Sequence, residues 1–156
     1  MAEITIPTAL KSLAMAGGAS KALAAWRKKS TGDSRALLNE LENNLRYLDL
    51  VAEDDVSLTD VVGELQILEF DRLLAEGFNF NSLKKKKIAT MPSLNSTKLE
   101  PWQGRETQEL IFSIYKKIKD IRVKYPHTST STKYRWSVRV HNIRKRIWLL
   151  AKHLNS

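Results

Sequence analysis

The sequence contains no cysteine. This absence excludes a disulfide scaffold, a thiolate metal site and cysteine catalysis, and it fits a reducing compartment. No apolar run approaches the roughly 20 residues that are needed to span a bilayer. The first residues also lack the early positive charge and the continuous apolar core of a signal peptide. We therefore expect a cytoplasmic protein without a membrane span.

Motifs that point to a cofactor or a metal are missing as well. There is no glycine-rich phosphate loop, no zinc signature, no serine nucleophile motif and no helix-turn-helix signature for reading bases. Four acids are spaced like metal ligands on a helix, namely Glu64, Glu69, Asp71 and Glu76. A helical di-metal site requires Glu-x-x-His pairs, and none occurs. We expect these acids to form a solvated or ion-pairing face, and we predict no cofactor and no metal.

Apolar residues make up 42% of the 156 residues, which is enough for one domain around a single core. They recur in steps of three and four, a spacing that is typical of helices with one buried side. The spacing predicts five helices, at residues 9–29, 35–53, 58–76, 105–124 and 134–154. We expect an all-α fold, a compact bundle in which helices two to five lie antiparallel to their sequence neighbours. Pro126 is expected to end the fourth helix.

A long irregular segment, residues 78–103, separates the third and fourth predicted helices. Pro92, Pro101 and a cluster of Ser, Asn and Thr argue against a helix there. At about 25 residues the segment is long for a loop, and long loops are often functional or mobile. It contains four consecutive lysines, Lys84, Lys85, Lys86 and Lys87. Such a run is usually solvated, and the functional alternative is a loop that contacts phosphate groups.

The net charge of +9 is unevenly distributed along the predicted single domain, 1–156. An acidic half, 1–78, carries 8 Lys and Arg against 13 Asp and Glu, a net charge of −5. Residues 79–156 carry 18 against 4, a net charge of +14, which is divided between the irregular basic loop 78–103 and a basic half, 104–156. Either the acidic half packs beside the basic half, or the basic half faces a polyanion. Because +9 remains, a basic excess is available to a partner.

The last predicted helix combines an apolar stripe with a basic ridge. The stripe consists of Trp136, Val140, Ile143, Ile147, Leu150 and Leu154. The ridge consists of Arg135, Arg139 and Arg146, with Arg144 and Lys145 beside it. We predict that this ridge and the lysine run bind the phosphate backbone of nucleic acid without catalysis.

Two neighbouring features bear on that prediction. Cations of the fourth helix could extend the ridge, namely Lys116, Lys117, Lys119, Arg122 and Lys124. Trp148 lies off the apolar stripe, and we expect it to be buried; an exposed Trp148 would be an interface anchor. The alternative function is an accessory subunit whose basic ridge docks on an acidic surface of a larger protein.

Two Arg–His spacings offer an enzymatic alternative. The pairs are Arg135 with His141, five residues between them, and Arg146 with His153, six residues between them. Both resemble the Arg-x(4–6)-His motif of the HEPN family of helical ribonucleases, in which two protomers bring arginine and histidine together and cleave RNA without metal. The resemblance implies that His141 acts as base and that Arg135 stabilises a charged phosphorane. It covers seven or eight residues, and Trp136 and Ile147 replace the family's polar residue after the arginine.

Overall fold

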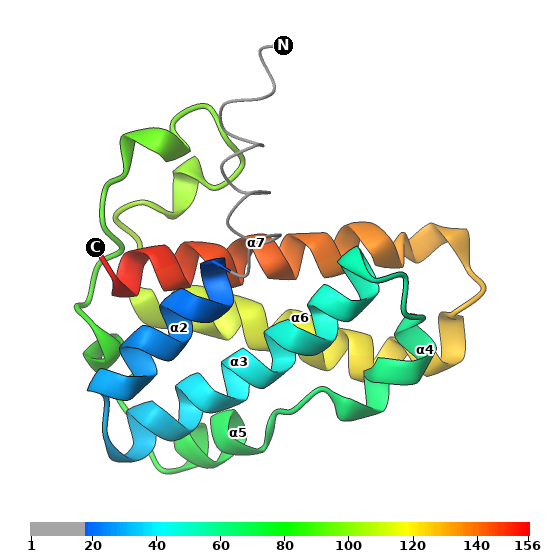
Figure 1. The fold of residues 1–156 in the computed structure, drawn as a ribbon, viewed down its shortest axis with the longest axis horizontal. Coiled ribbons are helices and arrows are strands. Elements are labelled where there is room, and N and C mark those ends of the chain that lie inside the picture. The colour runs from blue at the N-terminus through cyan, green and yellow to red at the C-terminus, as the bar shows by residue number, and fades with distance from the viewer. Residues whose placement is uncertain (1–17) are drawn as a thin grey trace.

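The computed structural model describes residues 18–156 and forms an all-α fold (Figure 1), which confirms the predicted fold class. The longer helices are α2 (Gly18–Lys29), α3 (Gly32–Glu53), α6 (Thr107–Thr128) and α7 (Trp136–Leu154). Two shorter helices are α4 (Leu58–Val61) and α5 (Leu68–Ala75). Within residues 18–156 the only strand-like pairing is an isolated bridge between Lys87 and Glu106. The part of the first predicted helix before Gly18 lies outside the described residues.

Helix α7 lies at the centre of the described fold, because it packs against α2, α3 and α6. Figure 1 shows that α6 and α7 run in opposite directions, as do α2 and α3. The regular antiparallel bundle expected for helices two to five stays a prediction in that detail. None of the described helices has both the length and the apolar composition that crossing a membrane requires.

Two contacts fix how α6 and α7 lie beside each other. At one end, the Thr107 hydroxyl of α6 lies 2.9 Å from Nε2 of His153 in α7. At the other end, the rings of Tyr125 and Trp136 pack edge to face, with centroids 5.5 Å apart. The two helices therefore stay side by side over most of their length, and the middle of α6 lies next to the middle of α7.

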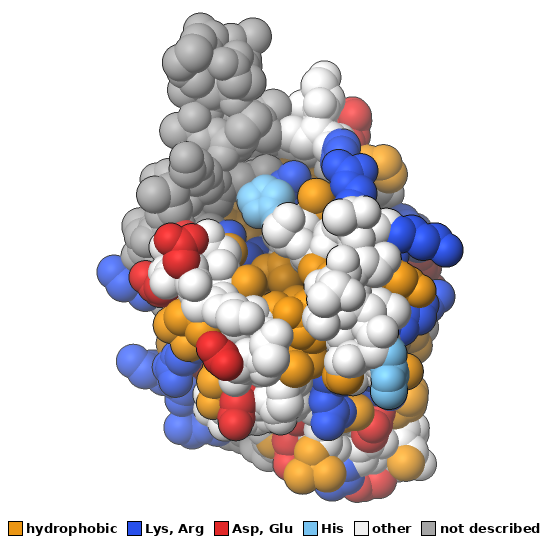
Figure 2. Space-filling model, turned by 90° about the vertical axis from the view of Figure 1, so that its right-hand side faces the viewer, with side chains coloured by type: hydrophobic (Ala, Val, Ile, Leu, Met, Phe, Trp, Pro, Cys, Tyr) orange, Lys and Arg blue, Asp and Glu red, His pale blue; other side chains and the backbone are white. Residues whose placement is uncertain are grey.

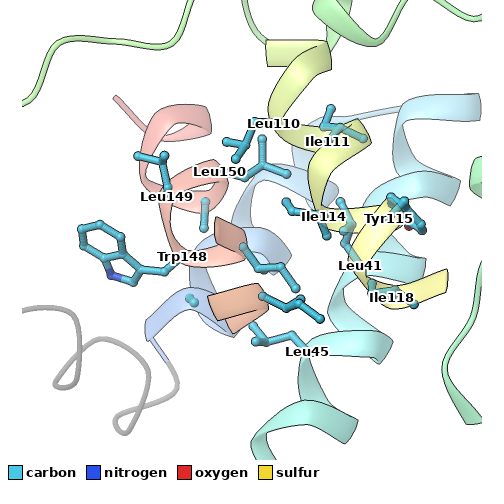
Figure 3. Close-up of a cluster of buried hydrophobic side chains, with 14 of the residues drawn as sticks. Leu41, Leu45, Leu110, Ile111, Ile114, Tyr115, Ile118, Trp148, Leu149 and Leu150 are labelled. Carbon is cyan, nitrogen blue, oxygen red and sulfur yellow. The ribbon is translucent and has the colours of Figure 1, made fainter. Parts of the chain in front are cut away.

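The apolar stripe predicted for the last helix is entirely buried, with Ile143, Ile147 and Leu150 fully inaccessible to solvent. In Figure 3, side chains of α3, α6 and α7 gather in one cluster in which Leu150 lies close to Leu110. Trp148 points away from α6 in this view and is only 5% exposed. The prediction of a buried Trp148 is confirmed, and α7 therefore buries two of its sides.

The single helix predicted for residues 58–76 is wrong, because the chain forms α4, the 3-10 helix η1 (Val62–Glu64) and α5 instead. The reason lies in α3, where the buried amide of Asn44 bonds the backbone of Gln66. Its Oδ1 accepts from the Gln66 N–H (2.6 Å), and its Nδ2 donates to the Gln66 carbonyl (2.7 Å). These bonds occupy the backbone groups that a continuous helix would need. A side chain 22 residues away in sequence therefore breaks the local pattern.

The predicted end of the fourth helix at Pro126 is also wrong, because α6 continues to Thr128. The ring-fixed φ of proline is compatible with a helical turn, although proline lacks an N–H and its ring crowds the carbonyl four residues earlier. The Thr128 hydroxyl donates to the Lys124 carbonyl (2.7 Å), and the Thr128 carbonyl accepts from the Trp136 indole (3.3 Å). These contacts hold the last turn in place despite the proline.

The irregular segment between α5 and α6 is anchored to the core at several points. It contains three 3-10 helices, η2 (Phe80–Leu83), η3 (Pro92–Leu94) and η4 (Glu100–Trp102). Its buried side chains are Phe80, Leu83, Ile88, Met91, Leu94, Leu99 and Trp102. Figure 1 shows that the segment lies beside the C-terminal end of α7.

Candidate anion-binding site

Two arginines of the predicted ridge lie on one face of α7 in defined positions. Arg139 and Arg146 are seven residues apart, which is close to two helical turns, and both are partly buried. Nε of Arg139 donates to the Tyr134 carbonyl (2.7 Å), and its guanidinium lies 5.4 Å from the Trp136 ring centroid. Nη1 of Arg146 donates to the Asn142 carbonyl (3.2 Å). Backbone oxygens therefore orient both guanidinium groups, and no carboxylate of the described residues pairs with either.

Lys117 of α6 completes this group from the neighbouring helix. Partial burial lowers the pKa of Lys117, and the positive charges of Arg146 and Arg139 lower it further. The charge of Asp120 acts in the opposite direction but does not outweigh them. The three positive charges, which come from two helices, are therefore close enough to act on one another electrostatically. We call Lys117, Arg139 and Arg146 the basic junction.

Arg146 is the most enclosed member of the basic junction. Burial lowers the pKa of its guanidinium, although the group stays charged at any physiological pH. Its Nε is buried and donates to no group among the described residues. A buried donor without an acceptor is unfavourable in a folded protein. Because this Nε is enclosed, a ligand from solvent would have to reach the Nη groups of Arg146.

Cations of the irregular segment extend the surface beyond Arg146. The pKa of Lys145 is lowered by partial burial and then by the charges of Lys98 and Arg146. The guanidinium of Arg146 lies 5.9 Å from the centroid of the Trp102 ring, which Arg105 approaches to 4.2 Å. The charge of Arg105 is paired with a carboxylate of α6 (2.8 Å). Lys98 and Lys145 therefore add positive charge beside Arg146.

The prediction that Arg144 belongs to an exposed ridge is wrong. The residue is only 7% exposed. Its Nε donates to Asp49 (2.7 Å), and its Nη2 lies 3.1 Å from Oε1 of Glu53. Burial raises the pKa of Asp49, and the hydrogen bond and charge of Arg144 oppose that shift. Arg144 thus joins α7 to α3 and is not available to a phosphate group.

The lysine run lies apart from the arginines at the start of α7. The carbonyls of Lys85 and Lys86 accept from the Thr107 hydroxyl (2.6 Å) and N–H (2.7 Å), beside the end of α7. Nζ of Lys84 lies 4.4 Å from the centroid of the Trp26 ring of α2, whereas Lys87 is exposed. Arg135 precedes the first residue of α7, so about 27 Å of helix separates the two ends. The predicted residues therefore do not form one cluster.

Other cations of α6 face different neighbours. Lys119 forms an ion pair with Asp71. Arg122 lines a shallow hollow with Val62, Gly63, Val123 and Pro126. Figure 2 views the end of the molecule where these elements meet, and there Lys, Arg, Asp and Glu side chains are interspersed with apolar ones. This end carries no continuous surface of one charge among the described residues.

Comparisons with known proteins were made on the whole chain. No protein-family model matches it, and neither does any curated protein or solved structure. Within residues 18–156, no group of three His, Asp or Glu side chains could hold a metal ion.

The first Arg–His pair of the HEPN-like motif does not meet within one chain. Arg135 adopts a left-handed conformation (φ 48°) before α7 begins, and its side chain is exposed. His141 lies six residues further on, which is about 9 Å along a helix and on another face. No hydrogen bond joins them. The pKa of His141 is lowered by burial and then by the charges of Lys145 and Arg144.

The second pair fails as a catalytic site because His153 is fully buried and both its ring nitrogens are used. Nδ1 accepts from the Ala89 N–H (3.2 Å), and Nε2 lies 2.9 Å from the Thr107 hydroxyl. That hydroxyl donates to the Lys85 carbonyl, so Nε2 must carry the proton and donate to it. His153 is therefore a neutral residue that joins α7 to the irregular segment and to α6.

This network predicts a pH-dependent loss of stability. Burial, followed by the charges of Lys85 and Lys84, lowers the pKa of His153 to about 4. In the unfolded chain the pKa of this histidine returns to about 6.5. The stability that the neutral His153 gives the folded state is therefore complete above that pH and is lost as pH falls toward 4. Between pH 7 and pH 5 the free energy of unfolding of the wild type should fall by about 2 kcal/mol more than that of His153→Gln, whose side chain cannot be protonated. Urea unfolding at both pH values measures this difference.

An independent readout accompanies the unfolding measurement. The ring protons of His153 should titrate near pH 4 in NMR spectra of the wild type, and His153→Gln identifies that resonance by its loss. Titration of this resonance near the ordinary histidine pKa, or an equal pH dependence of both proteins, would contradict the network.

Proposed function

We propose that the protein binds nucleic acid without catalysis, and that it contacts the phosphate backbone through the basic junction and the neighbouring Lys98 and Lys145. The observation that carries this proposal is the set of three partly buried cations without a carboxylate partner among the described residues. Burying a charge without a partner is unfavourable. Phosphate oxygens supply both the negative charge and the hydrogen-bond acceptors that the junction lacks.

Two arginines at the packing surfaces between helices contrast with the junction, because they pair with carboxylates, whereas the partly buried Lys84, Arg122 and Lys145 form no such pair among the described residues. Arg27 is bonded to Glu42, and Arg144 to Asp49 and Glu53. The acids of the first half thus neutralise particular cations at the packing surfaces between helices. The cations of the junction take no part in this neutralisation, which favours a polyanion as their partner.

Binding of this kind is electrostatic and tolerant of sequence, since guanidinium and ammonium groups contact phosphates rather than base edges. Affinity should therefore fall steeply with salt. If the three cations of the junction each neutralise one phosphate of duplex DNA, log K falls by about 2.7 per log unit of salt concentration. Lys98, Lys145 and the exposed Arg135 would steepen that slope.

The test is a triple variant, Arg135→Gln, Arg139→Gln and Arg146→Gln. Its matched control is Lys21→Gln, Lys28→Gln and Arg35→Gln, three exposed residues of α2 and α3 whose replacement removes the same total charge. Binding to a labelled single-stranded RNA and to a DNA duplex is measured across a salt series. We expect at least a tenfold loss of affinity for the first variant and less than a threefold loss for the control, with both melting cooperatively. Equal losses would contradict the assignment.

The same experiment separates the alternative functions. RNA recovered after binding is run on a gel, and fragments that disappear with His141→Ala would support a HEPN-like ribonuclease. Intact RNA with steep salt dependence supports a binding protein. Absence of binding at low salt would overturn the nucleic-acid proposal and leave the accessory subunit that docks on an acidic protein surface.

A further inference from the structure

We infer that the basic junction is a discrete site for one phosphate group, held between α6 and α7 by Lys117, Arg139 and Arg146. This inference rests on the proposed function, because it names the place and the chemical group that such binding would use. The group is a phosphodiester of nucleic acid or a free phosphate, which share the same tetrahedral oxyanion.

The helix register places the three cations around one point. Thr107 pairs with His153 at one end of the two helices, and Tyr125 lies against Trp136 at the other. Ten residues inward from the first pair, Lys117 is level with position 143 of α7. That position lies between Arg139 and Arg146, about 6 Å along the helix from the first and about 4.5 Å from the second. The lysine therefore approaches from α6, and the arginines approach from the two sides along α7.

The side chains are held in place before any ligand arrives. Backbone carbonyls of Tyr134 and Asn142 accept from Arg139 and Arg146, which leaves the remaining guanidinium N–H groups for a ligand. Rings beside both arginines, including Trp102 and Trp136, limit their motion further. Preorganised donors lose less conformational entropy when they bind. A site built in this way differs from a row of freely moving surface lysines.

Like-charge repulsion gives the junction a measurable property of its own. Three cations close together destabilise the fold when the site is empty, and an oxyanion bound only to the folded state stabilises it. This repulsion acts on Lys117, because its pKa is lowered by burial and then by the charges of the two arginines. Removing the lysine charge should therefore have opposite effects on the empty and the phosphate-bound protein.

The experiment measures thermal unfolding with increasing inorganic phosphate, at an ionic strength held constant with sodium chloride. The wild-type Tm should rise with the logarithm of phosphate concentration above Kd, and the rise should reach about 3 °C or more at a tenfold excess of phosphate over Kd. Lys117→Gln should melt above the wild type without phosphate and should not respond to it. Lys117→Arg should restore the response. Lys124→Gln removes the charge of an exposed lysine on the same helix, and this control should respond to phosphate like the wild type.

The outcomes distinguish this inference from the proposed function. A phosphate response without RNA or DNA binding would support the site and assign it to free phosphate. Nucleic-acid binding together with a phosphate response in Lys117→Gln equal to that of the wild type would overturn the site and leave the proposed function standing. A wild-type Tm that does not rise with phosphate at constant ionic strength would also overturn the site.

Discussion

Replacing Ile143 by aspartate should unfold the protein. Ile143 is fully buried in α7, the helix that packs against α2, α3 and α6. Loss of a buried isoleucine side chain costs about 2–5 kcal/mol, and burying an unpaired carboxylate adds several more. Because whole domains are stable by about 5–15 kcal/mol, the sum is comparable to the total. Far-UV circular dichroism at 25 °C and the absence of a cooperative melting transition measure this result.

The matched control is Val138→Asp on the same helix. Val138 is 40% exposed, so its new carboxylate would remain in water and leave the core intact. This variant should keep the wild-type spectrum and a cooperative transition within a few degrees of the wild type. A folded, cooperative Ile143→Asp protein would show that the register of α7 is wrong. Ile143→Val, which removes a single methyl group, should cost only about 0.5–1.5 kcal/mol.

Periodicity predicted the long helices well because their apolar stripes are local properties of the sequence. The stripe around Ile143 is buried as expected, and α3 contains the whole of the predicted helix 35–53. The helix predicted for 58–76 failed because Asn44 and Glu40 bond to its backbone from another helix. Such bonds override helix propensity, and no local pattern of apolar residues reveals them.

The candidate site shows the same division between local and distant information. Helical spacing alone put Arg139 and Arg146 on one flank of α7. It could not show that Arg144 is bound by Asp49, since 95 residues separate the two. The sequence suggested Lys117 only as one of several cations in its helix. Its place beside the arginines follows from the antiparallel contact of α6 with α7. The apolar stripes of the two helices suggest such a contact but do not determine it.

Replacing Glu40 by alanine is the second variant with a large expected effect. One carboxylate oxygen of Glu40 accepts from the Glu69 N–H (2.7 Å), and the other accepts from the Phe70 N–H (3.1 Å) and the Tyr115 hydroxyl (2.8 Å). The two amides lie in the first turn of α5, where a helix has no internal acceptors for its N–H groups. Glu40 is only 3% exposed, so water cannot easily replace the missing oxygens.

Glu40→Ala therefore leaves three enclosed donors unpaired. At about 1–3 kcal/mol for each of the three unsatisfied groups, the free energy of unfolding should fall by about 3–9 kcal/mol, as measured by urea denaturation. Tyr115→Phe removes one donor together with its bond and should cost about 1 kcal/mol. Glu64→Ala, at an exposed position of η1, is the control and should change stability by less than about 0.5 kcal/mol.

Hydrogen exchange would locate the effect of Glu40→Ala within the molecule. The amides of Glu69 and Phe70 should lose protection, because Glu40 is the acceptor that each of them has in the described structure. The basic junction lies between α6 and α7, so binding of phosphate to any folded fraction should persist. A Glu40→Ala protein as stable as Glu64→Ala would show that packing alone holds α5. The bonds from α3 would then not explain why the predicted helix 58–76 is broken.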